Sequence, residues 1–176
     1  KVWTALEQGF REYWTSQEYI EIHSPKIIGA PSESGAEVFE VKYFDRTAYL
    51  AQSPQFYKQM AMAAGFEKVF EVGPVFRAEP SFTSRHATEF TGYDAEFSYI
   101  TSHYDVMAQE EQAIAHALTK VKEQYGEEIK ALFDRDLVVP TIPFPKKTMK
   151  ETKEILAGMN VPSEKEGDLS PEEERK

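Results

Sequence analysis

Charged and aromatic side chains gather in the stretch 70–99, which reads FEVGPVFRAEPSFTSRHATEFTGYDAEFSY. The charged members that could act on a ligand are, in chain order, Arg77, Glu79, Arg85, His86, Asp94 and Glu96. An arginine at a strand end can make two parallel hydrogen bonds to a phosphate, and a later Arg-His pair can hold a more distal phosphate. Phe90 offers a face on which a base can stack. Taken singly, each residue fits a surface ion-pair cluster of little energy, but their order favours a nucleotide site.

The second half of this stretch has the period-two pattern of a strand. Alternation places Phe90, Gly92, Asp94 and Glu96 on one face and Tyr93, Ala95, Phe97 and Tyr99 on the other. Two carboxylates on one face are costly if that face is only core. A polar substrate pocket explains them, and so does a plain solvent face. The residues by themselves do not decide between the two.

A second candidate group lies in the segment AQSPQFYKQM. Ser53 and Pro54 are typical of a helix N-cap and first turn. Gln55 and Lys58 share one helical face near the positive N-terminus, which suits an anionic or zwitterionic ligand; a surface lysine and glutamine are the alternative. Glu33, in the small-residue loop APSESG, is either a solvated acid or a contact for a cationic group when the loop closes.

The pattern of secondary-structure signals around these groups predicts an α+β chain. The stretch 70–99 is a hairpin with a long loop, and a smaller hairpin over 38–50 has Asp45-Arg46 as its turn. A short strand at 19–23 ends before Pro25. Helical spacing is found at 2–14, 54–64, 103–125 and 148–158. The proline-rich segment 132–147 is expected to be a connector, and the acidic remainder is expected to be loosely ordered.

The composition limits the class of protein. With 176 residues, 41% of them hydrophobic, the chain can bury a core as one domain. The net charge of −10 argues against a general nucleic-acid binder, although a local basic patch can still hold phosphate. The absence of cysteine excludes disulfides and thiolate zinc sites. No apolar run reaches the roughly 20 residues of a membrane helix, so we expect no membrane partner and a cytoplasmic location.

The ordered residues of the hairpin resemble a known family. Phe76-Arg77-Ala78-Glu79, Arg85-His86 and Glu89-Phe90 are similar to motif 2 of the class II aminoacyl-tRNA synthetases. The entry helix with IEIHSPKII resembles motif 1, and Pro25 matches its proline. PSESGAEVF resembles the mobile loop that closes over the amino acid. AQSPQFYKQM resembles the recognition helix of the aspartyl branch, of archaeal and eukaryotic type.

The resemblance implies a role for each candidate residue. Aspartate would be bound by Glu33, Ser53, Gln55, Lys58 and Asp94, with Lys58 on its side-chain carboxylate. ATP would be bound by Arg77, Glu79, Arg85, His86 and Phe90, with Arg77 on the α-phosphate as the catalytic residue. Residues 79–88 would also meet the tRNA acceptor end, and the 1–28 region would form a homodimer. Glu96 has no assigned role.

The implied activity is that of an aspartate–tRNA ligase, which forms aspartyl-adenylate from ATP and transfers aspartate to tRNA. The implied fold is an antiparallel sheet flanked by helices, a partial catalytic domain over 1–176. Residues 1–135 would be its core, and 136–176 the connector, short helix and acidic tail. Motif 3 and the anticodon-binding domain are absent from the sequence, and the Mg²⁺ that accompanies ATP would find its ligands beyond residue 176. The chain begins and ends inside helical patterns, so we expect a fragment that does not activate aspartate alone.

Three other functions stay open. The first is an asparaginyl-tRNA synthetase, against which Lys58 argues, because the relatives that charge asparagine carry an apolar residue there. The second is an aspartate-amidating paralogue, which would also bind aspartate. The third is a non-catalytic nucleotide-binding module that keeps the hairpin without the chemistry.

Overall fold

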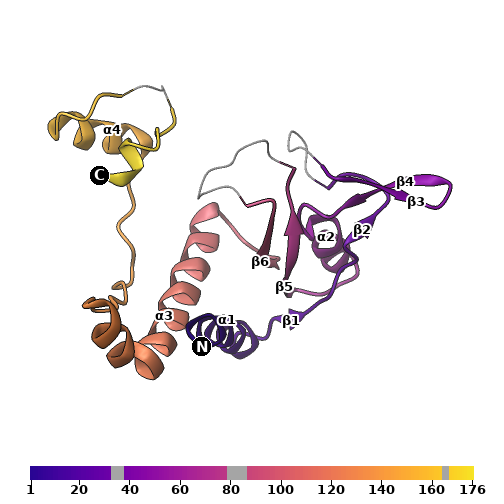
Figure 1. Ribbon diagram of the computed structural model, residues 1–176, viewed down its shortest axis with the longest axis horizontal. Coiled ribbons are helices and arrows are strands. Elements are labelled where there is room, and N and C mark those ends of the chain that lie inside the picture. The colour runs from indigo at the N-terminus through magenta and orange to yellow at the C-terminus, as the bar shows by residue number, and fades with distance from the viewer. Residues whose placement is uncertain (33–37, 79–86, 164–166) are drawn as a thin grey trace. The chain divides into compact units, whose positions relative to one another are not determined.

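The computed structural model describes residues 1–32, 38–78, 87–163 and 167–176. They fall into two compact units, Lys1–Val139 and Pro140–Lys176. The larger unit combines helices with two three-stranded sheets, in the strand orders β1-β5-β6 and β2-β4-β3 (Figure 1). The predicted α+β class is therefore confirmed. Within the described residues, no helix is both long enough and apolar enough to cross a membrane.

The first sheet is built on the predicted hairpin. β5 (Lys68–Phe76) and β6 (Glu89–Phe97) pair antiparallel over their whole length. β1 (Ile20–Glu21) adds a short parallel strand to β5. It is shorter than the predicted strand at 19–23, because beyond Ile22 the chain leaves the ladder and the Ser24 N–H donates to the Glu71 carboxylate, at 3.0 Å.

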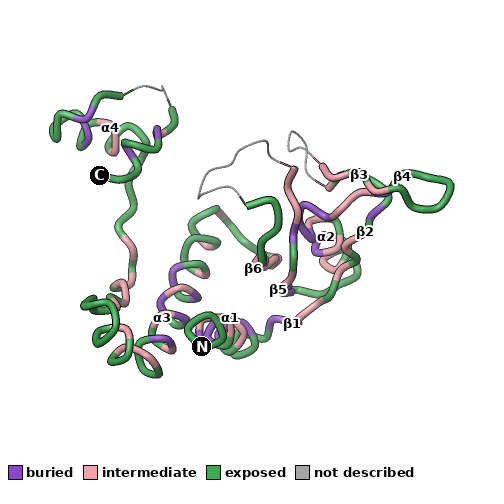
Figure 2. Tube along the Cα trace, viewed as in Figure 1, coloured by how far each residue is buried: buried purple, intermediate pink, exposed green. Residues whose placement is uncertain are grey.

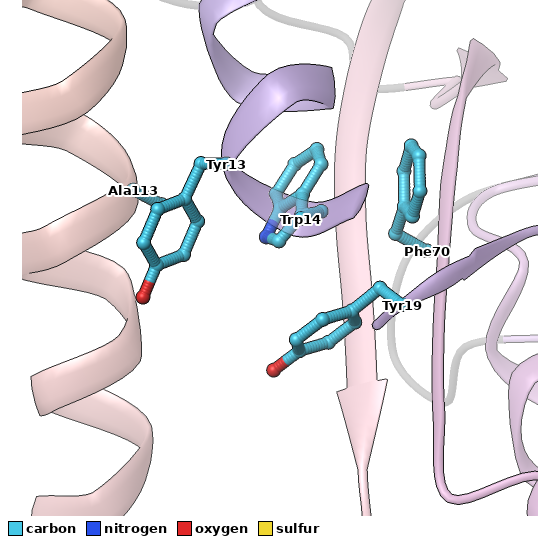
Figure 3. Close-up of a cluster of buried hydrophobic side chains, with 5 residues drawn as sticks. All are labelled: Tyr13, Trp14, Tyr19, Phe70 and Ala113. Atoms are coloured by element: carbon cyan, nitrogen blue, oxygen red, sulfur yellow. The ribbon is translucent and has the colours of Figure 1, made fainter. Parts of the chain in front are cut away.

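One face of this sheet packs into the hydrophobic core of the larger unit. Helices α1 (Val2–Ser16) and α3 (His103–Phe133) contribute to that core. Its buried centre, shown in Figure 3, consists of Tyr13, Trp14, Tyr19, Phe70 and Ala113. Burial raises the pKa of Tyr19 to about 12. From β6, Tyr93, Ala95 and Phe97 pack against this centre, so the apolar face predicted from alternation is the core face.

The prediction failed for Tyr99, which is 86% exposed. β6 ends at Phe97, and Tyr99 has left the strand with a φ of 62°. The strand therefore ends at Phe97, although the alternation of aromatic residues in the sequence continues to Tyr99.

Helices α1 and α3 cross closely at Gly9. A Cβ there would lie 2.6 Å from the Ala117 Cα, closer than side-chain and backbone carbons pack. Figure 2 shows buried positions on both helices, whereas the last turns of α3 are largely exposed. Helix α3 begins as predicted, with a capping box formed by Ser102 and Asp105. It continues to Phe133 rather than 125, because Gly126 costs only about 1 kcal/mol in a helix and good helix formers follow it.

The second sheet holds the small hairpin and leads into α2. β2 (Ile27–Ile28) and β3 (Glu40–Tyr43) both pair antiparallel with β4 (Arg46–Leu50). Tyr43 pairs with Arg46, so the turn is Phe44-Asp45, one residue earlier than predicted. Phe44 takes the positive φ of 56° that such a turn needs. Helix α2 (Gln55–Ala63) follows, and Gly65 leaves it at a φ of 98°.

The smaller unit contains α4 (Met149–Gly158) and a 3-10 turn, η1 (Glu173–Arg175). A capping box of Thr148 and Glu151 opens α4, and the helix ends at Gly158, in agreement with the predicted range 148–158. The described tail, 167–176, is not loosely ordered as predicted: Glu173 is buried and accepts a 2.7 Å hydrogen bond from the Lys153 ammonium. Together with a bond from the Ser170 N–H, this lowers the pKa of Glu173 to about 2.

Candidate functional site

The second face of the central hairpin carries two of the predicted ligand-binding residues, Phe90 and Asp94, and helix α2 contacts both of its strands. Lys58, on the second turn of α2, is only 5% exposed. Its ammonium Nζ lies 3.0 Å from Asp94 Oδ1 and 3.5 Å from Glu96 Oε2. Asp94 and Glu96 therefore do not form a plain solvent face, because a buried cation from another element covers them.

The charges of this trio define what it can attract. One ammonium and two carboxylates leave a net charge of −1, which favours a cationic group nearby. An ammonium has three N–H donors: one makes the 3.0 Å hydrogen bond to Asp94, and a second can serve Glu96, the ion-pair partner at 3.5 Å. The third donor can serve a ligand carboxylate. The trio therefore suits a molecule with both an ammonium and a carboxylate.

The chain segment before α2 is buried and polar. Gln52 is fully buried, and its Oε1 accepts a 3.2 Å hydrogen bond from the Ser32 N–H. The Ser53 hydroxyl accepts from the Gln55 N–H at 3.2 Å, so Ser53 supports the helix start although Pro54 occupies the cap position. Gln55 lies one helical turn before Lys58, as the spacing predicted.

Arg77 and Phe90 meet at the other end of the hairpin. The Arg77 guanidinium carbon lies 5.5 Å from the centre of the Phe90 ring, and the Arg77 N–H donates to the Thr88 carbonyl at 3.0 Å. The Arg77 Nε is buried, and within the described residues it has no hydrogen-bond partner. A buried donor without a partner is costly, so this atom fits an anion supplied by a ligand. Phe90, 37% exposed, leaves part of its ring open for stacking.

Two paired glycines separate these two ends. Gly73 and Gly92 are Cα partners, lying between the Glu71–Asp94 pair and the Val75–Phe90 pair. A Cβ on Gly92 would lie 2.9 Å from Asp94 Oδ2, so the lack of a side chain makes room for that carboxylate. We call the face of the hairpin between the Lys58 trio and Phe90 the floor; it is about 13 Å long from Asp94 to Phe90, and its two central positions carry no side chain of their own.

The structure brings together some predicted residues and adds others. Lys58 and Asp94 are in contact, as are Arg77 and Phe90, whereas Glu33, Glu79, Arg85 and His86 lie outside the described residues. Sequence reasoning missed the contact of Glu96 with Lys58. It also missed Gln52 and the polar cluster of Ser24, Lys26 and Glu71 on the same face. The sequence offered one sign of this cluster: Glu71 is a charged residue inside the apolar strand pattern, directly before Val72-Gly73.

Cavities and metal-binding clusters do not add to this site. One cavity of about 300 Å³ lies on the core face, lined mainly by apolar and aromatic residues such as Trp14 and Tyr93. Another of about 700 Å³ lies between Ile28 and the Phe56–Met60 side of α2. Neither is lined by Lys58. In the part of the chain that the structure describes, no group of three or more His, Cys, Asp or Glu residues is placed to hold a metal ion.

The chain belongs to the family of class II tRNA synthetases (D, K and N), whose family model matches residues 1–174. The resemblance and the fold class predicted from the sequence are thereby confirmed.

Curated relatives and solved structures agree with this family. The aspartate–tRNA(Asp/Asn) ligase of Methanopyrus kandleri is 46% identical over 176 residues, 100% of this chain and 41% of the relative. The corresponding ligase of Aeropyrum pernix is 49% identical over 148 residues, 84% of this chain and 33% of the relative. The asparaginyl-tRNA synthetase of Pyrococcus horikoshii, complexed with asparaginyl-adenylate, superposes with a TM-score of 0.87 at 34% identity, covering 99% of this chain and 40% of that one. The chain thus spans about 40% of the length of these proteins.

Proposed function

We propose that this chain is part of an aspartate–tRNA ligase, which activates aspartate with ATP and transfers it to tRNA. The observation that carries the proposal is Lys58, a buried ammonium held between two carboxylates on the hairpin floor. The remaining N–H donor of this ammonium can bind a substrate carboxylate, while the net negative charge of the trio favours the ammonium of the same substrate. The names of the relatives from Methanopyrus and Aeropyrum support the same amino acid.

The proposed binding mode follows the two ends of the floor. The side-chain carboxylate of aspartate takes the third donor of Lys58, and its ammonium lies against Asp94. Glu33, Ser53 and Gln55 complete the surroundings of the amino acid. The adenine stacks on Phe90, and the α-phosphate binds the guanidinium of Arg77, whose buried Nε lacks another partner among the described residues. Glu79, Arg85 and His86 take the adenine amine and the terminal phosphates.

The chemistry requires no protein nucleophile. The α-carboxylate of aspartate attacks the α-phosphorus of ATP, a bond to aspartate forms, and pyrophosphate leaves. Holding both reactants on one floor makes the step effectively intramolecular. Arg77 stabilises the negative charge that develops at the phosphorus, and the Mg²⁺ bound to ATP supplies further charge neutralisation.

Partners of the whole protein follow from the same proposal. The acceptor end of tRNA would approach along residues 79–88. The 1–28 region would form a homodimer, which is supported by the exposure of Trp3 (76%) and Ile27 (52%) in that region. We propose a cytoplasmic location, because the proposed product, charged tRNA, is used in protein synthesis there. Light scattering at micromolar concentration tests the dimer.

ATP–pyrophosphate exchange in the full-length protein tests the activity. Exchange that depends on aspartate, followed by transfer of labelled aspartate to tRNA, supports the proposal. Exchange that depends on asparagine would instead assign the chain to the function of its Pyrococcus structural neighbour. Aspartate-dependent exchange without transfer to tRNA points to an amidating paralogue. ATP binding without exchange points to a non-catalytic module.

A further inference from the structure

A second ion pair lies on the same face of the hairpin as the Lys58 trio. Glu71, on β5, is only 3% exposed, and the Lys26 ammonium donates to its Oε1. The Ser24 backbone N–H donates to Glu71 Oε2 at 3.0 Å, and the Ser24 hydroxyl donates to Oε1 at 3.1 Å. Lys26 also donates to the Ser24 hydroxyl at 3.1 Å. Glu71 is therefore a buried carboxylate with one cation and two neutral donors.

The register of the hairpin places Glu71 beside the amino-acid site. Glu71 and Asp94 are directly opposed Cα partners, so their side chains leave the same face with Cβ atoms about 5 Å apart. Directly opposed like charges destabilise a strand pair. Each carboxylate here has its own ammonium, Lys26 for Glu71 and Lys58 for Asp94.

We infer that Lys26 and Glu71 form a positioning pair. By neutralising Glu71, Lys26 leaves the Lys58 ammonium in contact with Asp94 and Glu96 and free to bind the carboxylate of the substrate. This inference rests on the proposed function, since it concerns how the same site recognises aspartate. Without Lys26, Glu71 would be a buried carboxylate that lacks a cation. The Lys58 ammonium, which contacts the residue directly opposite, would then be drawn toward Glu71. Its third donor would no longer be available to the substrate.

Two further features tie this pair to the site. A Cβ on Gly73 would lie 3.2 Å from Glu71 Oε1 and 3.6 Å from the Lys26 ammonium, so the pair lies over the first of the two floor glycines. The Lys26 carbonyl accepts from the Ala51 N–H at 2.9 Å, directly before the buried Gln52 and Ser53. The pair therefore connects the segment between β1 and β2 both to the floor and to the entry of α2.

The test is a set of variants in the full-length protein, assayed by aspartate-dependent ATP–pyrophosphate exchange. Lys26→Met is expected to raise the KM for aspartate about tenfold, equivalent to about 1.4 kcal/mol. The KM for ATP, and kcat at saturating aspartate, should change less than about twofold. Lys26→Arg retains the cation and should leave the aspartate KM near that of the wild type. The double variant Lys26→Met/Glu71→Gln, which leaves no unpaired carboxylate, should bring the aspartate KM back to within about threefold of the wild type.

Arg11→Met serves as the matched control. It removes the ion pairs of Arg11 with Glu21, at 2.9 Å, and with Glu7, neither of which lies on the floor of the site. It is expected to lower the thermal midpoint without changing the aspartate KM. Midpoints are measured for every variant, and if Lys26→Met does not fold, the double variant alone decides, because a large rise in its aspartate KM contradicts the inference.

The outcomes separate this inference from the proposed function. A wild type that does not use aspartate overturns the proposed function. A wild type that uses aspartate, with equal losses for aspartate and ATP in Lys26→Met, shows a merely structural pair and overturns the positioning role alone. Failure of the double variant to recover aspartate affinity does the same.

Discussion

Replacing Lys58 by methionine is the sharpest test of how the site recognises its amino acid. Methionine keeps the length and the apolar stem of the side chain but removes the ammonium that contacts Asp94 and Glu96. Removing one member of a buried, hydrogen-bonded charge pair costs about 2 to 5 kcal/mol. At 1.4 kcal/mol per factor of ten, this corresponds to a loss of about 30-fold to several thousandfold in kcat/KM for aspartate. Lys58 is only 5% exposed, so solvent screens little of this effect.

The assay compares aspartate with asparagine in ATP–pyrophosphate exchange. The neutral amide of asparagine depends less on the ammonium, so the preference for aspartate over asparagine should fall in Lys58→Met. Gln59→Met, at the next and exposed position of the same helix, is the matched control and should keep both the rate and the preference. Equal losses for the two amino acids, or an aspartate kcat/KM within twofold of the wild type, would show that the Lys58 ammonium does not select aspartate.

Three other changes test the helix crossing, the strand-end arginine and the smaller unit. Gly9→Ala puts a methyl group 2.6 Å from the Ala117 Cα, so we expect a loss of about 1 to 3 kcal/mol in chemical denaturation, and an unchanged midpoint would contradict the close crossing. Arg77→Lys keeps the charge but loses the planar guanidinium fork. We expect the ATP–pyrophosphate exchange rate to fall about 100-fold while the aspartate KM stays nearly constant. An unchanged exchange rate would contradict the binding of phosphate by Arg77. The pKa of Glu173 is lowered to about 2, so its contribution to stability is complete above the ordinary value of 4.5 and is lost as the pH falls toward 2. Exchange protection of the Ser170 amide, which donates to Glu173, should decrease over that range, and in Glu173→Gln this pH dependence should be absent; an identical pH profile would argue against it.

Local patterns predicted the elements well because their causes are local. The hairpin of β5 and β6 follows from alternation within each strand, and its core face was identified correctly up to Phe97. The capping boxes at Ser102 and Thr148 lie within four residues of the atoms that they bind, so the starts of α3 and α4 were predictable. The end of α3 was predicted too early, because the weak preference of Gly126 was given too much weight against the helix formers that follow it.

The candidate site was predictable in part. Residue types and order placed Lys58, Asp94, Arg77 and Phe90 among the ligand-binding candidates, and the structure brings them together as two contacting pairs. Trp3 lies within the helical spacing predicted over 2–14 but is exposed, since burial depends on where the neighbouring helix lies and not on spacing alone.

The hairpin could be predicted from the sequence because alternation and turn chemistry act within a few positions of one another, and its motif residues carry the resemblance to the class II synthetases. Which charges meet depends on the tertiary structure. Lys58 pairs with Asp94 across 36 positions, and Glu71 binds Ser24 across 47. Such pairs depend on strand register and on the packing of α2 against the sheet, and no local spacing encodes either. For the same reason Glu96, which had no role in the sequence, became a contact of Lys58 in the fold.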